Sequence, residues 1–266
     1  DVEVSAYLSN RQIDIVDEGY DLAIRLGKLS DSTMMAKKLG LPIHQFIAAT
    51  NINDVVPNLD LNTDKGNFKL HDFIGEQWTI LFSHPKDYTP VCTTEFGAVA
   101  PLADEWKKRN TKVIGLSVDT VEEHKGWKRD IESYSGSPAD FPIIADDNLA
   151  VAKTLDMLPA DAYLSDGRTA ADSASVRVVF IFSPDKKLQL SMTYPMSVGR
   201  NFAEILRALD ALQATYGVPI ATPADWNPGE DVIAALSLSD DEAKEKFGEM
   251  NVVLPYLRKV AQPKPL

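Results

Sequence analysis

Residues 84–97, HPKDYTPVCTTEFG, hold Cys92, the only cysteine of the 266-residue chain. They follow the apolar run 77–84, QWTILFSH, which predicts a buried strand, and they lead into residues 93–108, whose apolar spacing predicts an amphipathic helix. Cys92 is therefore expected at the head of a helix that follows a strand after one short loop. The unpaired N–H groups and partial positive charge of a helix N-terminus stabilise a thiolate, which is the nucleophilic form of cysteine.

The loop before Cys92 has features that suit a pocket beside a nucleophile. Pro85 and Pro90 restrict the backbone, and each removes an N–H group. Thr89, three residues before Cys92, can direct its hydroxyl at the sulfur or at a bound ligand. A lone cysteine is nevertheless commonly a small buried apolar residue. Position alone therefore leaves a reactive and a structural interpretation of Cys92 open.

Predicted strands and helices alternate along the chain beyond residue 51, which favours an α/β fold with a central sheet covered on both faces. The helix predicted at residues 121–133 begins with a capping box formed by Thr120 and Glu123. The other predicted elements are hairpins over residues 55–73 and 175–195, buried strands at 111–119 and 141–146, and helices at 148–157 and 201–216. The proline-rich residues 217–266 are expected to form an irregular appendage around one short helix, without a core of their own.

The composition excludes several classes of partner. Lys and Arg number 27 against 39 Asp and Glu, which gives a formal net charge of −12. Nucleic acids and anionic membrane surfaces both require a basic footprint, and no apolar run is long enough to span a bilayer. A single cysteine cannot form an internal disulfide, so the fold does not depend on an oxidising compartment. With no secretory signal visible, a cytoplasmic location is expected.

The spacing of Pro85, Thr89 and Cys92, a P-x-x-x-T-x-x-C arrangement, resembles the peroxidatic signature of the peroxiredoxins. From about residue 54 onward the chain resembles the one-cysteine, peroxiredoxin-six type of that family. The further segments that carry the resemblance are VIGLSVD, FPIIAD, RVVFIFSPDKKLQLSMTYP, GRNFAEILRALDALQ and TPADWNPGEDV. The resemblance implies a thioredoxin-like peroxiredoxin fold with a C-terminal appendage, and reduction of hydrogen peroxide and organic hydroperoxides.

The resemblance also implies a role for each matching residue. Cys92 matches the peroxidatic cysteine, Thr89 the threonine that hydrogen-bonds the peroxide, and Pro85 the proline that shields the site. Arg177 matches the arginine that stabilises the thiolate and polarises the O–O bond. Three residues match supporting positions: a carboxylate that orients the arginines, a second arginine and a histidine beside the pocket, which are Glu95, Arg200 and His84.

Structural interpretations of the supporting residues are also open at this point. Arg177 lies in an alternating strand, where it could be an edge charge, and Arg200 could serve a turn or a helix start. His84 could be a hydrogen-bonded core histidine, and a direct catalytic role for it is not favoured. His44 and His124 lack metal-ligand spacing with each other or with Cys92, so neither a metal nor a cofactor is expected.

A chain with one cysteine cannot resolve a sulfenic acid by an internal disulfide. The sequence therefore predicts an external reductant, either a small thiol or a partner protein. A thioredoxin-type disulfide oxidoreductase is excluded because residues 92–95, CTTE, lack the C-x-x-C pair. An alternative function is a peroxide-sensing regulatory module that signals through oxidation of Cys92. The resemblance implies a homodimer with the C-terminal appendage at its interface.

The first fifty residues differ from the rest of the chain. Residues 8–40 resemble part of the effector-binding domain of LysR-type transcriptional regulators, around the strand EGYDLAIRLG. Neither a complete lobe of that domain nor a DNA-binding helix pair is present. The predicted organisation is a partial N-terminal α/β fragment at 1–50, a thioredoxin-like domain at 51–216 and a C-terminal domain at 217–266.

Overall fold

The computed structural model describes residues 51–158 and 174–263. These residues belong to the second of two units of the chain, residues 48–266. The LysR-like fragment predicted at residues 1–50 lies outside the described residues.

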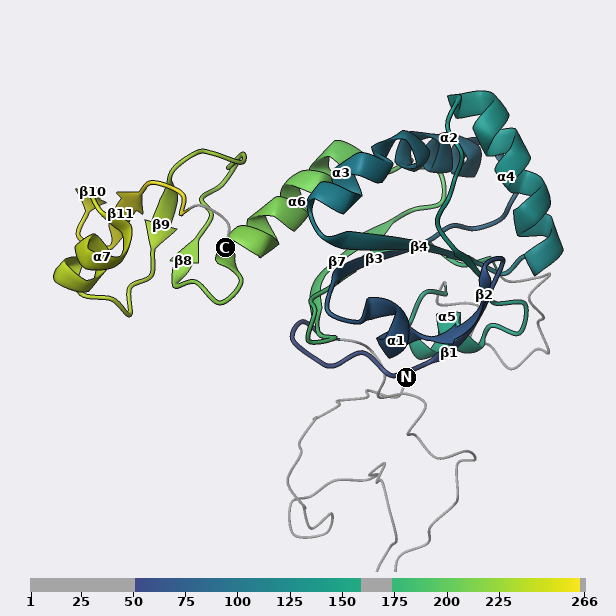
Figure 1. The fold of residues 1–266 in the computed structure, drawn as a ribbon, viewed down its shortest axis with the longest axis horizontal. Coiled ribbons are helices and arrows are strands. Elements are labelled where there is room, and N and C mark those ends of the chain that lie inside the picture. Colours follow the sequence, from purple (N-terminus) through teal and green to yellow (C-terminus); the bar gives the residue numbers. More distant parts are fainter. Residues whose placement is uncertain (1–50, 159–173, 264–266) are drawn as a thin grey trace, which may run out of the picture. The chain divides into compact units, whose positions relative to one another are not determined.

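A seven-stranded sheet with the order β2-β1-β5-β4-β3-β6-β7 forms the centre of this unit (Figure 1). The strands β3, β4 and β5 run parallel, while β6 is antiparallel to β3, β7 to β6, and β1 to both β5 and β2. The bounds of the strands are β1 (Asp60–Thr63), β2 (Gly66–Lys69), β3 (Trp78–Ser83), β4 (Thr111–Ser117), β5 (Ile143–Ala145), β6 (Arg177–Phe182) and β7 (Leu188–Tyr194). The two predicted hairpins are thus β1–β2 and β6–β7.

Helices cover both faces of this sheet, as the sequence predicts (Figure 1). Alternate residues of the fully buried strand β3 belong to different cores: Leu81 packs in one, while Ile80 and Phe82 pack in the other. The first core is closed by α1 (Leu70–Ile74) and α5 (Ala150–Thr154). The second is closed by three helices, α2 (Pro90–Val99), α4 (Val121–Ser135) and α6 (Phe202–Thr215).

The single helix predicted at residues 93–108 is three elements in the structure. It begins earlier, with α2 at Pro90, and continues as the 3₁₀ segment η2 (Ala100–Leu102) and as α3 (Ala103–Lys108). Proline fits the first turn of a helix, where its missing N–H leaves no bond unmade. Pro101 has no N–H with which to continue the ladder, so the α-helix is interrupted there. The second strand predicted within residues 55–73 is also shorter, because α1 begins at Leu70.

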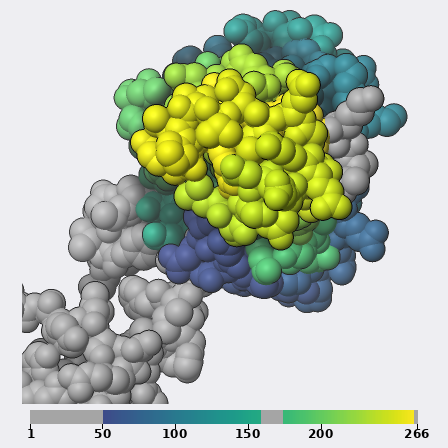
Figure 2. Space-filling view, turned by 90° about the vertical axis from the view of Figure 1, so that its left-hand side faces the viewer, coloured from purple at the N-terminus to yellow at the C-terminus, as the bar shows by residue number. Residues whose placement is uncertain are grey.

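The expectation that residues 217–266 lack a core of their own is wrong. The described part of this segment, residues 217–263, forms an antiparallel four-stranded sheet of order β10-β11-β9-β8 beside the helix α7 (Asp240–Phe247). The strands are β8 (Ile220–Ala221), β9 (Val232–Ala234), β10 (Met250–Leu254) and β11 (Leu257–Val260). Trp226, Val232 and Val260 are buried among them, and Ala211 of α6 packs against this cluster. These residues make one continuous body in the space-filling view (Figure 2). Their apolar residues are scattered in sequence and meet only through strand pairing.

Replacing Trp226 by alanine tests this C-terminal core. The indole is fully buried, and its Nε1 donates a hydrogen bond to the Glu230 carbonyl at 3.1 Å. We expect a loss of about 3–5 kcal/mol in the free energy of unfolding, because truncating a large buried aromatic residue leaves a cavity. Urea unfolding followed by circular dichroism measures this loss, with Tyr256→Ala, which truncates an exposed ring in the turn between β10 and β11, as the control. Equal stability of the two variants would contradict the assignment of a core.

Among the described residues, no helix combines the length and the apolar character needed to cross a membrane.

Candidate active site

Cys92 lies in the first turn of α2, as predicted, and its side chain is fully buried. The strand β3 ends at Ser83, and the loop from His84 to Thr89 leads into the helix, with Thr89 as the N-cap residue. Cys92 is the third residue of the helix, within the turn whose backbone N–H groups have no intrahelical acceptors. The sulfur is therefore placed against unpaired backbone dipoles and away from bulk water.

Arg177, the first residue of β6, reaches the sulfur. Its Nη1 lies 3.4 Å from Cys92 Sγ and 2.7 Å from Glu95 Oε2, and its Nε donates to the Met196 carbonyl at 2.9 Å. Because β6 lies between β3 and β7 and the Arg177 side chain is 4 % exposed, the residue is not an edge charge. Its strand position and three contacts aim the guanidinium at Cys92.

Glu95 joins two arginines below the sulfur. It follows Cys92 by three residues and therefore projects from a neighbouring position on the same face of α2. Arg200 donates to Glu95 Oε1 from Nε and from its backbone N–H, both at 2.9 Å, and to Oε2 from Nη2 at 2.7 Å. Arg200 Nη1 also donates to the carbonyl groups of Ser83 and Val178. This geometry fixes the end of β3, β6 and α2 relative to one another.

The charges of this buried group do not balance without the sulfur. Arg177 and Arg200 carry two positive charges, and Glu95 carries one negative charge, so the three side chains have one positive charge in excess. All three are less than 10 % exposed. An uncompensated buried charge is costly, and a thiolate at Cys92 would neutralise this one. The arrangement is therefore matched to a negatively charged sulfur.

Thr89 and Pro85 lie in the loop that leads to Cys92, but neither contacts the sulfur through a hydrogen bond in the described part of the chain. The Thr89 hydroxyl donates to the Lys86 carbonyl at 2.9 Å, and the Thr89 carbonyl accepts from the backbone N–H of Thr93. Thr89 is partly exposed, whereas Pro85 is buried directly after β3. The structure thus brings Cys92, Glu95, Arg177 and Arg200 into direct contact, with Thr89 and Pro85 at their side.

His84 is completely buried and belongs to an aromatic group. Its ring stacks on Trp127 with centroids 4.9 Å apart and meets the edge of Phe96 at 4.6 Å. Its Nε2 lies 2.6 Å from Asp87 Oδ1, while Nδ1 has no hydrogen-bond partner among the residues that the structure describes. Burial lowers the pKa of His84 despite the hydrogen bond to Asp87, so the neutral imidazole with a proton on Nε2 fits this site.

Sequence reasoning missed a second buried group beside His84, formed by Asp87, Ser117, Asp119 and His124. His84, Asp87 and Asp119 each place one potential ligand atom within 4.8 Å of the others. Those atoms already take part in hydrogen bonds, because Asp87 Oδ1 meets His84 Nε2 and Asp119 Oδ2 accepts from Ser117 and from the Asp87 N–H. One signal for this group was present in the sequence, which is Asp87 in the loop quoted above. His124 gave no signal, because its partner Asp87 is distant along the chain.

Acid is expected to destabilise the protein through Asp87. Burial by itself would raise the pKa of this carboxyl, but its contacts with His124 and His84 outweigh burial and bring the pKa from 3.8 down to about 2. The stabilisation is present above the unfolded value and is lost as the pH falls toward the folded value. The lowered pKa of His84 acts in the same direction below pH 6.5, because His84 binds a proton in the unfolded chain and stays neutral in the folded chain.

Urea unfolding at several pH values measures this effect. Between about pH 5 and about pH 3 the Asp87 shift removes about 1 kcal/mol from the free energy of unfolding. Asp87→Asn should lose less stability than the unchanged protein over this interval, whereas the exposed control Asp130→Asn should follow the unchanged protein. Parallel pH dependences for all three proteins would show that Asp87 is not ionised within a hydrogen-bonded cluster.

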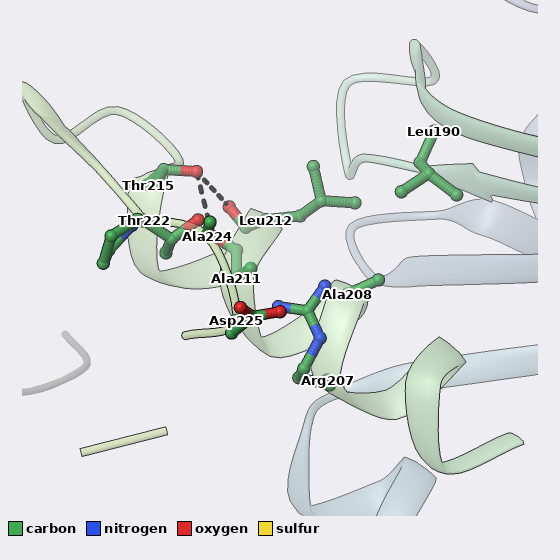
Figure 3. Close-up of a pocket in the computed structure, with 10 residues that line it drawn as sticks. Leu190, Arg207, Ala208, Ala211, Leu212, Thr215, Thr222, Ala224 and Asp225 are labelled. Atoms are coloured by element: carbon green, nitrogen blue, oxygen red, sulfur yellow. Dashed lines mark hydrogen bonds between the residues drawn. The ribbon is translucent and has the colours of Figure 1, made fainter. Parts of the chain in front are cut away.

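A groove of about 240 Å³ is found elsewhere, along α6 (Figure 3). It is lined by Arg207, Ala208 and Ala211 of α6, by Leu190 of β7 and by residues 222–225. None of its lining residues belongs to the group around Cys92.

The fold and this site define a class: a sheet with helices on both faces carries one buried cysteine at a helix N-terminus, in contact with an arginine–glutamate–arginine group. Comparisons with known proteins agree with that class. Residues 52–191 match the model of the AhpC/TSA family, and residues 211–249 match the C-terminal domain of 1-Cys peroxiredoxin.

Two curated relatives share almost half of their aligned residues with this chain. Peroxiredoxin-6 of Mus musculus is 49% identical over 222 residues, which cover 80% of this chain and 97% of the relative. The mitochondrial peroxiredoxin PRX1 of Saccharomyces cerevisiae is 47% identical over 210 residues, which cover 78% of this chain and 79% of the relative.

Solved structures show the same fold. Peroxiredoxin 6 of Arenicola marina superposes with a TM-score of 0.74 at 44% identity, covering 80% of this chain and 99% of that one. A yeast mitochondrial 1-Cys peroxiredoxin gives a TM-score of 0.71 at 45% identity, covering 79% of this chain and 99% of that one. The chain belongs to the AhpC/TSA family, and within it to the 1-Cys peroxiredoxins of the peroxiredoxin-6 type. It has the thioredoxin-like fold of that family and is a thiol-dependent peroxidase. The matches begin at residue 52 in the family model, so the LysR-like resemblance of the preceding residues gains no support.

Proposed function

We propose that Cys92 is the peroxidatic cysteine of this peroxidase and that Arg177 is its principal electrostatic partner. The observation that carries the proposal is the 3.4 Å contact between Arg177 Nη1 and Cys92 Sγ within a buried group of excess positive charge. Glu95 and Arg200 hold Arg177 in position, since each guanidinium donates to the same carboxylate. His84 supports the pocket by packing against Trp127 and Phe96.

The reaction begins with attack of the Cys92 thiolate on one peroxide oxygen. An S–O bond forms and the O–O bond breaks, so that the sulfur is oxidised to a sulfenic acid while the second oxygen leaves with the electron pair of the O–O bond. That oxygen takes up a proton and departs as water or an alcohol. Arg177 and the Thr89 hydroxyl supply donors for the developing negative charge, which requires Thr89 to turn its hydroxyl away from Lys86. Pro85, buried at the end of β3, limits access of water.

An external thiol completes the cycle, because the chain has no second cysteine. Attack on the sulfenic sulfur forms a mixed disulfide and releases water, and a second thiol then restores the Cys92 thiol. The yeast mitochondrial 1-Cys peroxiredoxin has a thiol resolving mechanism that works through glutathione and thioredoxin systems. A small thiol or a thioredoxin-like protein is accordingly the proposed reductant. Since Cys92 is fully buried, either must gain access through opening of the first turn of α2.

The proposed organisation is a thioredoxin-like domain at 51–216 followed by a C-terminal domain at 217–266, in a homodimer. The outer strand β7 supports a dimer, because one edge of it has no partner strand in the described part of the chain. The exposed Val252, Val253 and Tyr256 of the C-terminal sheet offer apolar surface for such a contact. Sedimentation analysis tests this organisation, with twice the monomer mass expected and a monomer contradicting it. A cytoplasmic location is proposed on the absence of any requirement for disulfides.

Repeated turnover tests the proposed activity as a whole. With excess dithiothreitol and a limiting amount of protein, we expect consumption of many equivalents of hydrogen peroxide per Cys92. Each equivalent should consume one equivalent of the dithiol, and the same assay with cumene hydroperoxide tests organic peroxides. Consumption that stops after one equivalent, with the thiol still present and Cys92 not over-oxidised, would contradict a catalytic cycle.

A further inference from the structure

A buried group of polar side chains lies directly under the loop that carries the active site. The Asp87 carboxylate contacts two imidazoles at 2.6 Å each, His84 through Oδ1 and His124 through Oδ2. The backbone N–H of Asp87 donates to Asp119 Oδ2 at 2.8 Å, and Ser117 Oγ donates to the same oxygen at 2.7 Å. All five residues are 5 % exposed or less. The loop is therefore fixed at its midpoint by hydrogen bonds with its own first residue, with the residues at the end of β4, and with α4.

The partners of His124 define its protonation. Nδ1 faces the Asp87 carboxylate, and Nε2 faces the Ile144 carbonyl of β5 at 3.2 Å. Both partners are acceptors, and a neutral imidazole has only one N–H to donate. Both contacts form together only when His124 carries two ring protons and a positive charge.

The neighbouring charges favour this cation. The Asp87 carboxylate faces His124 directly, and the Asp119 carboxylate accepts from the backbone N–H of Asp87. His84 faces Asp87 as a neutral ring. Glu123, the preceding residue of α4, is turned to the N-cap residue Thr120 through a capping box. The low pKa of Asp87, near 2, fits a carboxylate held between imidazole donors.

The helix α4 also holds the active-site segment on either side of this ion pair. Tyr88 lies against Gly126, where a Cβ would collide with its hydroxyl, and that hydroxyl donates to the Glu123 carbonyl at 3.3 Å. Trp127 Nε1 donates to Thr93 Oγ1 at 3.1 Å. The loop and the first turn of α2 thus dock on one face of α4, with the His124–Asp87 ion pair as the buried charged contact. Asp87 precedes Thr89 by two residues and Cys92 by five, so a shift of Asp87 is transmitted directly to both.

We propose that His124 is a positioning residue for the peroxidase reaction. As a buried imidazolium it anchors Asp87, and through Asp87 it keeps Thr89 and Cys92 in position relative to Arg177. The inference rests on the proposed role of Cys92. Without the His124 imidazolium, either Asp87 or the Ile144 carbonyl loses its donor, and a buried carboxylate then lacks a counter-charge. The loop loosens, the Arg177–Cys92 contact lengthens, and the rate of reaction with peroxide falls.

The test compares the rates at which three proteins react with hydrogen peroxide: the unchanged chain, His124→Gln and Lys125→Gln. Lys125 is the adjacent, half-exposed residue of the same helix and serves as the control. At about pH 7 we expect His124→Gln to react about tenfold more slowly or worse, since small misplacements of reacting groups carry large rate penalties. Lys125→Gln should react at the rate of the unchanged protein. A residue that only stabilises the fold would lower the folded fraction and leave the rate of each folded molecule unchanged.

Two further readouts keep the inference testable on the unchanged chain. Nitrogen-15 NMR of histidine-labelled protein should show both ring nitrogens of His124 protonated, because each of them faces an acceptor. Alkylation of Cys92 by iodoacetamide should be faster in His124→Gln than in Lys125→Gln, because the loop opens more often. If His124→Gln fails to fold, the NMR measurement on the unchanged protein decides.

The inference is overturned if His124 is neutral in the folded protein, or if His124→Gln matches the unchanged protein in its rate of reaction with peroxide and in the rate of alkylation of Cys92. Failure of the proposed function looks different. In that case the unchanged protein and Cys92→Ser react with peroxide at the same rate, while the NMR measurement still reports the protonation of His124.

Discussion

Cys92→Ser is expected to abolish the reaction with peroxide. A serine hydroxyl is hardly ionised at neutral pH and is a weak nucleophile without an adjacent base, and no other cysteine can replace the lost sulfur. The change exchanges a single atom for a slightly smaller one in a fully buried position, so the fold should be retained. Stopped-flow mixing of the reduced protein with hydrogen peroxide, followed by tryptophan fluorescence, measures the loss, because Trp127 packs beside the active-site loop.

The matched control for this prediction is Ser83→Ala, which removes a hydroxyl at the end of β3 without touching the sulfur. Its Oγ accepts from the Val178 N–H and donates to the Val176 carbonyl, so the control should lose some stability and keep the peroxide reaction. Residual peroxide consumption by Cys92→Ser comparable to that of the unchanged protein would place the chemistry on another residue.

Arg177→Ala is expected to slow the same reaction by about 10²–10³-fold, the usual cost of removing a preorganised donor from a developing negative charge. Two effects combine here. The sulfur loses the guanidinium at 3.4 Å, and Glu95 keeps only Arg200, so the excess positive charge of the buried group disappears. The second-order rate constant with hydrogen peroxide measures the loss under the conditions used for Cys92→Ser.

Arg207→Ala provides the control for the loss of a guanidinium, because Arg207 is paired with Glu204 on α6 and lies outside the Cys92 group. It should retain the rate of the unchanged protein. Arg177→Lys should fall between the two, since an ammonium keeps the charge but cannot reproduce the fixed pair of contacts to Met196 and Glu95. An Arg177→Ala variant that is folded and reacts at the unchanged rate would refute the electrostatic role.

The central sheet could be predicted from the sequence because its signals are local. The buried strand β3, the capping box of α4 and the β6–β7 hairpin each follow from residues that are neighbours in the chain. The position of Cys92 followed from the same local pattern. The break at Pro101 was also visible in the sequence, but the apolar spacing on both sides obscured it.

What could not be predicted depends on contacts between distant residues. The pairing of β9 with β11 joins segments that are separated along the chain by α7 and β10, and this pairing creates the C-terminal core. The His124–Asp87 contact likewise joins α4 to the loop after β3, and α2, η2, α3 and β4 separate these two segments along the chain. Arg177 and Arg200 were placed near Cys92 by resemblance alone; their shared carboxylate, Glu95, gives the physical reason for that placement.

The rate of reaction of the reduced protein with hydrogen peroxide, set against that of free cysteine at the same pH, tests the central claim most directly. A preassembled site in which Arg177 meets a buried Cys92 sulfur predicts a second-order rate constant roughly a thousandfold or more above that of the free thiol. A rate constant no greater than that of free cysteine would contradict the account, because the group around Cys92 would then contribute nothing to the chemistry.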